Sequence, residues 1–175
     1  MTEVKTYLYL ALLSAIAVVL HLVETLIPMS VIIPGAKLGL ANAMVLLALV
    51  LFGYQAGIKV LLLRIIISSF LLGTFMTINF YLSLAGGLLS FGIMLILHKY
   101  LGDKFSLVGI SLAGAIVHNV GQIMTAYLII DNWGIFYYLP YLLFFSLPTG
   151  IFIGLTVIYL EEHLRLNFKL NQEFN

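Results

Sequence analysis

Arg64 is the residue of this sequence whose chemistry most needs an explanation, because it lies in the middle of a long apolar run. A guanidinium stays charged and offers a planar fork of N–H donors that suits a carboxylate or a phosphate. Such a charge is costly inside a bilayer and persists only where it faces a polar interior. Arg64 is therefore predicted to anchor an anionic ligand group or to form an internal ion pair, for which Glu24 is the candidate carboxylate.

Other polar residues are spaced so that they share helix faces. Ser111, Gly114, His118, Gln122 and Thr125 follow one another at intervals of three or four, so they form one stripe. Asn119 lies about 100° away from His118 and is expected to bond a neighbouring helix. The predicted substrate-binding set is Arg64, His118, Gln122, Asn119, Asn42, Lys37, His21, Glu24 and Asn79. Interhelical hydrogen bonding, or a position near the head groups for His21 and Glu24, is the alternative.

Catalysis and metal binding find little support in the residue types. His21, Glu24 and His118 could supply an N/N/O metal site, but their spacing is a weak signal, and we expect no metal and no cofactor. The aspartates, Asp103 and Asp131, are too far apart in the chain to hold Mg²⁺ against a diphosphate as a pair. The sequence has no phosphate-binding loop and no cysteine. The protein is predicted not to be an enzyme.

The composition requires lipid as the solvent. Hydrophobic residues make up 63% of the 175 residues, charged residues 9%, and the mean hydropathy is +1.16. No water-soluble domain of this length could bury so much apolar surface, so we predict an integral membrane protein. The net charge of +1, with no basic patch, gives no indication of nucleic-acid binding.

The apolar runs predict a single all-α transmembrane domain, residues 1–175, with six helices. Pro28 and Pro34 make the first connection stiff and non-helical, and a turn is expected at residues 73–79 because residues 65–97 carry no charge and are too long for one crossing. The four-residue spacing of Gly150 and Gly154 favours close helix packing. Pro148 is expected to kink the last helix. The expected helices are Thr6–Ile27, Lys37–Phe52, Ala56–Leu72, Phe80–Tyr100, Leu107–Ile130 and Tyr138–His163.

The lysines and arginines predict the orientation. Lys5, Lys59, Lys99, Lys104, Arg165 and Lys169 fall on one side of a six-helix chain, and only Lys37 falls on the other. Because cytoplasmic loops are enriched in these residues, both termini are expected in the cytoplasm. Most of the polar residues then lie between the middle of the membrane and its outer surface, which predicts a pocket open to the outside.

Three blocks resemble a known family. They are Pro34-Gly-Ala-Lys-Leu-Gly-Leu-Ala-Asn42, Leu82-Ser-Leu-Ala-Gly-Gly-Leu-Leu-Ser90 and Gly114-Ala-Ile-Val-His-Asn-Val-Gly-Gln122. They resemble the bacterial membrane family labelled heptaprenyl diphosphate synthase component I, or Gx transporter family, over about Leu10 to Leu160. That family in turn is similar to the substrate-binding S components of energy-coupling factor transporters. The resemblance implies a six-helix bundle in the bacterial plasma membrane.

The resemblance to S components also implies partners. Their Ala-x-x-x-Ala motif docks on a transmembrane coupling subunit that works with ATPases, and here it matches Ala11 and Ala15. The first functional hypothesis is therefore a transporter subunit that takes up a small anionic or polar-headed nutrient. The alternative, which the family label implies, is a non-catalytic accessory subunit in polyprenyl diphosphate or menaquinone synthesis. The outward bias of the polar residues and the lack of paired aspartates favour the first.

Overall fold

A computed structural model describes residues 3–26, 39–102 and 104–168 of the protein. These residues form α1 (Glu3–Leu26), α3 (Leu40–Phe52), α4 (Tyr54–Leu71), α5 (Ile78–Leu101), α6 (Leu107–Ile130), the 3-10 helix η1 (Trp133–Tyr138) and α7 (Leu139–Phe168). The prediction of an all-helical protein is confirmed, and most helix ends fall within a few residues of the expected positions. The expected stiff connection at residues 28–35 lies outside the described residues, as does Lys37.

Five helical segments of the described chain are long and apolar enough to cross a membrane: Val4–Leu26, Tyr54–Leu71, Ile78–Leu101, Leu107–Ile130 and Trp133–Leu164. The exposed surface of these segments is rich in large apolar side chains such as Leu8, Leu63 and Leu128, which are suited to contact with lipid. The 13 residues of α3 extend only about 20 Å. α3 is shorter than the other five segments, so the six crossings expected from the sequence stay a prediction.

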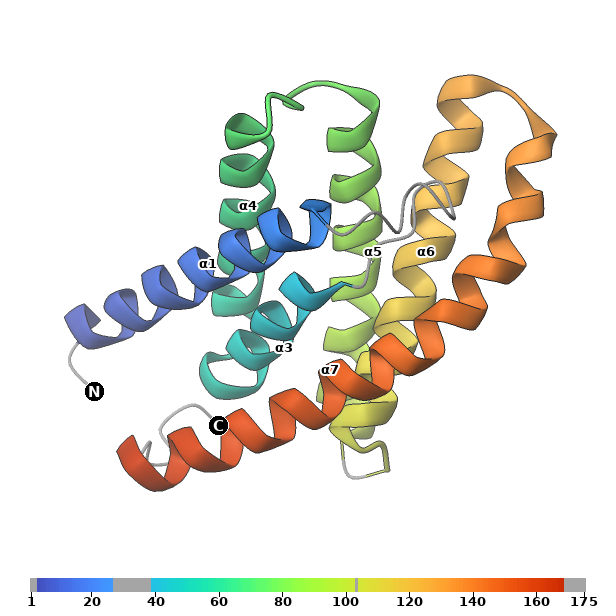
Figure 1. The fold of residues 1–175 in the computed structure, drawn as a ribbon. Coiled ribbons are helices and arrows are strands. Elements are labelled where there is room, and N and C mark those ends of the chain that lie inside the picture. The colour runs from blue at the N-terminus through green and yellow to red at the C-terminus, as the bar shows by residue number, and fades with distance from the viewer. Residues whose placement is uncertain (1–2, 27–38, 103, 169–175) are drawn as a thin grey trace.

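α3 lies at the centre of the bundle. It packs against α1, α4, α5 and α7, and 11 of its 13 residues are buried. A helix that is apolar on all sides needs apolar surroundings, and here the other helices provide most of them. The short second helix of the sequence is thus the core around which the longer helices are arranged (Figure 1).

Glycines form the sharp breaks between helices. Gly53, with φ of 82°, is the single residue between α3 and α4, and it adopts a conformation that disfavours any side chain. The turn between α4 and α5 contains Gly73 and Met76, both with positive φ, so the predicted break at residues 73–79 is confirmed. Ser106 caps the start of α6, where its hydroxyl accepts a hydrogen bond from the Gly109 N–H at 3.2 Å.

Glycines also allow α6 and α7 to approach closely. A Cβ atom at Gly150 would lie 2.8 Å from the Cα of Leu112, and one at Gly154 would collide with the backbone of Val108. The predicted role of this glycine pair in close packing is confirmed. α7 also contains Pro148, and Figure 1 shows α7 changing direction along its length, as a proline inside a helix causes.

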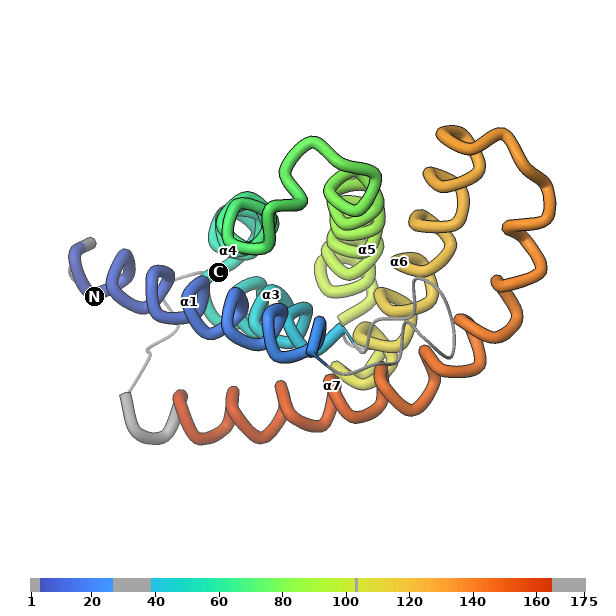
Figure 2. The backbone as a smooth tube through the Cα atoms, turned by 45° about the horizontal axis from the view of Figure 1, so that its top comes forward, coloured from blue at the N-terminus to red at the C-terminus, as the bar shows by residue number. Residues whose placement is uncertain are grey.

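The helix connections alternate between the two ends of the molecule. Figure 1 shows the α4–α5 turn and the α6–η1 turn at the top, whereas the α5–α6 turn lies at the bottom. The first residues of α1 and the last turns of α7 lie together at the lower left. Figure 2 shows α4 and α5 nearly end-on, with α1 and α7 crossing them obliquely.

Candidate polar pocket

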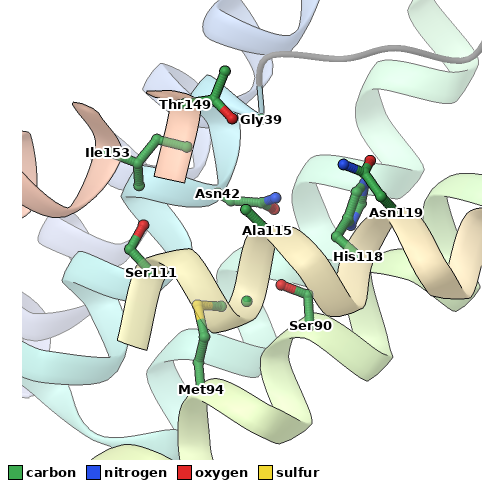
Figure 3. A pocket seen from close by; sticks show the side chains of 11 residues that line it. Gly39, Asn42, Ser90, Met94, Ser111, Ala115, His118, Asn119, Thr149 and Ile153 are labelled. Atoms are coloured by element: carbon green, nitrogen blue, oxygen red, sulfur yellow. The ribbon is translucent and has the colours of Figure 1, made fainter. Parts of the chain in front are cut away.

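A small pocket opens between α3, α5, α6 and α7 (Figure 3). Its volume of about 20 Å³ has room for about one water molecule, whereas pockets for small-molecule ligands usually measure about 300–1,000 Å³. Polar side chains form much of its wall although it lies inside an apolar bundle. The lining residues are Gly39, Asn42, Ser90, Met94, Ser111, Gly114, Ala115, His118, Asn119, Thr149 and Ile153.

α6 supplies the largest part of the pocket wall. Ser111, Gly114 and His118 line the pocket from one face of α6, as their spacing of three and four residues predicted. Gly114 is needed there, because a Cβ atom at this position would lie 2.8 Å from the Met94 sulfur and 3.2 Å from the Ser90 hydroxyl. The stripe of polar residues on α6 therefore faces α5 across a gap that is only as wide as a glycine permits.

Asn119 lines the same pocket and also connects two helices. Its side-chain Nδ2 donates a hydrogen bond to the carbonyl oxygen of Leu142 in α7 at 3.1 Å, which confirms the expectation that Asn119 bonds a neighbouring helix. The amide oxygen remains able to accept a hydrogen bond. Asn119 thus fixes the position of α7 relative to α6 at the edge of the pocket.

Ser90 is the clearest polar group directed into the pocket (Figure 3). Its side chain is 1% exposed, and its hydroxyl has no hydrogen-bond partner among the described residues. Leaving a buried hydroxyl unsatisfied costs about 1–3 kcal/mol, so a ligand or a water molecule that bonds Ser90 is stabilised by that amount. Residue spacing alone did not identify Ser90, Met94 or Thr149 as pocket residues.

A signal for Ser90 was nevertheless present in the sequence. Ser90 follows Gly86 by four residues on α5, so the two share a face, and Gly86 packs against α6. A small residue and a hydroxyl on one face of a membrane helix indicate close contact with another polar helix. Thr149, one residue after Pro148, had no comparable signal because its place depends on the course of α7.

Arg64 and Gln122 are buried outside the pocket lining. Arg64 is 5% exposed, and its Nη2 atom lies 3.7 Å from where a Cβ of Gly87 would be. A Cβ at the adjacent Gly86 would lie 2.8 Å from the Cγ of Gln122 and 3.1 Å from the Cε1 of His118. Two successive glycines of α5 thus let Arg64 approach from α4 and the polar stripe approach from α6.

Both of these side chains keep unused hydrogen-bonding capacity. The Nε of Arg64 and the Oε1 of Gln122 are buried without a hydrogen-bond partner among the described residues. Buried polar atoms in membrane helices are expensive and are expected to be satisfied by water or by a ligand. Arg64 also interacts electrostatically with Glu24, so the two roles weighed from the sequence, ion pairing and ligand anchoring, are compatible.

Glu24 has a defined structural position. Its carboxylate, 7% exposed, accepts hydrogen bonds from the backbone N–H groups of Gly39 and, at 3.4 Å, Leu40. These groups lie at the first turn of α3, where a helix has unsatisfied donors and a partial positive charge. Glu24 therefore connects the end of α1 to the beginning of α3, and Gly39, the residue before α3, lines the pocket.

The remaining predicted site residues lie elsewhere. Asn42 lines the pocket, but Asn79 is exposed in the first turn of α5 and is not among the lining residues. His21 is partly buried on α1, also outside the pocket lining. In the described part of the chain no group of three or more metal-binding side chains comes together. The structure therefore assembles part of the predicted set around one pocket and leaves the rest apart.

Ala11 and Ala15 are exposed on α1. They share the outer face of the helix with Leu8, Leu12 and Ile16, which are 69%, 55% and 39% exposed. The opposite face of α1 packs on α3 and α4. The two alanines thus belong to a surface that no described part of the chain covers.

Comparison with protein families gives a match over residues 13–160, to the family described as heptaprenyl diphosphate synthase component I. The chain belongs to the heptaprenyl diphosphate synthase component I family. The resemblance identified from the three sequence blocks is thereby confirmed. No curated protein and no solved structure matches the chain.

The region shared with the heptaprenyl diphosphate synthase component I family contains the whole pocket. Every lining residue, from Gly39 to Ile153, falls inside residues 13–160, and so do Glu24, Arg64 and Gln122. Of the two alanines on the outer face of α1, Ala15 lies inside the shared region and Ala11 lies outside it. The pocket residues thus lie within the part of the chain that matches the family.

Proposed function

We propose that this protein is a substrate-binding subunit, similar to an S component, of an energy-coupling factor type transporter. In this role it takes up a small nutrient with a polar or anionic head group from the outer side of the bacterial plasma membrane. The observation that carries the proposal is the buried polar pocket between four helices of an otherwise apolar bundle. Polar groups at such a depth are costly unless they bind something.

The pocket chemistry suits a ligand with hydrogen-bond donors and acceptors. Ser90, Ser111 and Asn42 can each donate and accept, and His118 and Gln122 would fix the orientation of the ligand. Arg64 would supply the positive charge for an anionic group, because it approaches Gly87 of α5 while Gln122 and His118 of α6 approach the adjacent Gly86. His21, Glu24, Lys37, Asn79 and Asn119 complete the residues proposed to contribute to binding or to the entrance.

A nutrient is larger than the pocket as it stands. A cavity of about 20 Å³ holds about one water molecule, so the proposal requires α3, α5, α6 and α7 to move apart when the ligand enters. Gly114 and Met94 are close together in the pocket wall, so a separation of α5 from α6 would widen the pocket there. Methionine is a suitable wall for such a site, since its flexible side chain adapts to a new neighbour.

The proposed partner is a transmembrane coupling subunit that is driven by ATPases. Ala11 and Ala15 on the exposed face of α1 would form the docking surface, because small residues four apart let a partner helix approach closely. The proposal also includes six membrane crossings with both termini in the cytoplasm. This orientation is supported by the excess of lysine and arginine in the loops and termini predicted to lie on one side of the membrane.

Small molecules retained by the purified protein test the proposal. Wild-type protein and an Asn42→Leu variant are purified in mild detergent, and the released compounds are identified by liquid chromatography and mass spectrometry. We expect one polar compound with the wild type and its loss in Asn42→Leu, which removes hydrogen bonds from the pocket wall. The matched control is Gln55→Leu, which also replaces a side-chain amide by leucine but at an exposed site of α4 outside the pocket lining, and which should retain the compound.

The family description favours a second candidate, a non-catalytic membrane subunit of a heptaprenyl diphosphate synthase. In that case the protein would contact a soluble synthase or receive its prenyl diphosphate. Co-expression with a polyprenyl synthase from the same genome separates the two functions. A prenyl diphosphate among the retained compounds, or synthase activity that depends on this protein, would replace the transport proposal.

A further inference from the structure

Aromatic side chains gather at the two turns at one end of the bundle. The turns are the α4–α5 connection and the α6–η1 connection, both at the top of Figure 1. We name these side chains the aromatic rim and define it as Phe70, Phe75, Phe80, Tyr81, Tyr127, Trp133 and Phe136. Each half of the rim is held together by its own ring contacts, so its shape is built into the fold.

The α4–α5 half is a continuous row of rings. Phe75 stacks on Phe70 with 4.2 Å between ring centroids, and it makes an edge-to-face contact with Phe80 at a centroid distance of 5.1 Å. Tyr81 continues the row at 5.5 Å from Phe80. These contacts span the turn itself, so they fold the α4–α5 connection down onto the ends of its two helices.

The α6–η1 half is centred on Trp133. Its ring centroid lies 4.9 Å from that of Tyr127 and 5.4 Å from that of Phe136. At the start of η1, the Asn132 side chain accepts a hydrogen bond from the Gly134 N–H at 2.8 Å. Trp133 is nevertheless 72% exposed, and Tyr137 beside it is 82% exposed. Large aromatic surfaces with polar N–H and O–H groups are thus presented to the surroundings.

The opposite end of the bundle has a different chemistry. There Lys59 lies over the ring of Tyr7 at 5.6 Å and Lys99 over the ring of Tyr100 at 5.4 Å. By contrast, residues 65–97 and 105–160 carry a single Asp, Glu, Lys or Arg side chain, Asp131. The rim end is therefore aromatic and nearly uncharged, whereas the other end carries charged side chains, among them Lys59 and Lys99.

Helix length places the rim at a definite depth. α5 and α6 each contain 24 residues, which extend about 36 Å at ~1.5 Å per residue. The hydrocarbon core of a bilayer is about 30 Å thick, and about 40–45 Å including the head groups. When these helices cross the bilayer, their end turns fall just beyond the hydrocarbon, in the interfacial layer that tryptophan and tyrosine favour.

We propose that the aromatic rim is a lipid-binding surface that lies at the boundary between acyl chains and head groups, in the leaflet opposite Lys59 and Lys99. The rim fixes the depth of the α4–α5 and α6–α7 pairs in the bilayer, and its occupant is the lipid interface. The two other possible surroundings of the rim, water and a docked protein, are outcomes that the test distinguishes. The proposal does not depend on transport or on any ligand of the pocket.

The single tryptophan of the sequence makes the proposal directly measurable. Purified protein is reconstituted into phosphatidylcholine vesicles with nitroxide labels either near the head group or near the end of the acyl chain. We expect Trp133 fluorescence to be quenched at least twofold more strongly by the shallow label than by the deep one. Acrylamide in the water should quench it less than free tryptophan.

A relocated tryptophan provides the control for depth. Met124 is 53% exposed on α6, nearly two turns before the end of that helix, so the Trp133→Phe/Met124→Trp variant should be quenched more strongly by the deep label. Equal quenching of Trp133 by both labels, or acrylamide quenching as strong as that of free tryptophan, would overturn the interfacial placement. Weak quenching by every agent would indicate a protein contact and would overturn it as well.

Discussion

At the scale of single residues, Arg64 and Glu24 show how charge is kept inside this bundle. Glu24 is bonded to the first backbone N–H groups of α3, so its negative charge compensates the positive end of that helix. Arg64 interacts with the same carboxylate but keeps an unsatisfied Nε. Glu24 therefore does not depend on Arg64 alone, and Arg64 has capacity left for a ligand.

Arg64 is expected to act as the anion anchor of the proposed site. Arg64→Lys keeps the charge but loses the planar fork, and a charged hydrogen bond is worth about 1.5–3 kcal/mol, so ligand retention should weaken about tenfold or more. Arg64→Met should abolish retention while the protein still inserts. Thermal stability and retained ligand, measured on both variants, test this expectation.

A double variant separates a structural role from ligand binding. If Arg64 served only to balance Glu24, Arg64→Met would lower the melting temperature and Arg64→Met/Glu24→Gln would restore it. Normal retention by a stable Arg64→Met protein would rule out the anchor. Because Glu24 keeps its bonds to Gly39 and Leu40, we expect only a modest loss of stability in Arg64→Met.

At the scale of helices, glycine positions decide which polar groups meet. Gly86 and Gly87 are neighbours on α5 but face α6 and α4 respectively. Adjacent residues of α5 therefore contact the polar stripe of α6 and Arg64 of α4. Gly150 and Gly154 let α7 approach the backbone of α6 at Leu112 and Val108. Close approach of this kind replaces the hydrophobic effect as the force between helices in lipid.

Gly154→Ala is expected to destabilise the protein. The added methyl group would meet the backbone of Val108, which cannot move without separating α6 from α7, and overpacking of this kind costs about 1–3 kcal/mol. Gly92→Ala is the matched control, because nothing lies within 4 Å of its added Cβ, and helix propensity favours alanine by about 1 kcal/mol. In thermal unfolding, equal melting temperatures for the two variants would contradict the close packing.

The outer face of α1 has its own prediction. Replacing Ala11 and Ala15 together with leucine should leave folding and ligand retention nearly intact, because both positions are exposed and a lipid-facing site tolerates volume. Co-purification with the proposed coupling subunit should fall, since the partner helix can no longer approach closely. Failure of the double variant to fold would instead place these alanines in an internal contact.

At the scale of the whole molecule, the arrangement of the ends predicts the topology. The first residues of α1 and the last turns of α7 lie on the same side as the α5–α6 turn (Figure 1). That side carries Lys59, Lys99 and Lys104. A cytoplasm-specific reporter fused to the C-terminus should therefore be active. A silent reporter on a normally expressed protein would reverse the orientation and move the pocket entrance to the other face.

The sequence alone predicted the membrane environment, the positions of the helices and the family. The hydropathy and the spacing of breaks such as Gly53 and Gly73 predicted where helices begin and end, because these signals are local and lipid leaves the backbone few alternatives. The spacing on α6 predicted that Ser111 and His118 share a face. The three blocks, distinctive when taken together, were sufficient to indicate the family.

The tertiary structure decided which predicted residues share a site. Arg64 and Asn79 are similar polar interruptions of apolar runs in the sequence, yet one is buried against Gly87 and the other is exposed. Ser90 and Thr149 joined the pocket because of how α5 and α7 cross α6. Periodicity specifies the face of one helix, but the rotation and crossing of helices depend on contacts between residues distant in sequence, such as Gly154 with Val108.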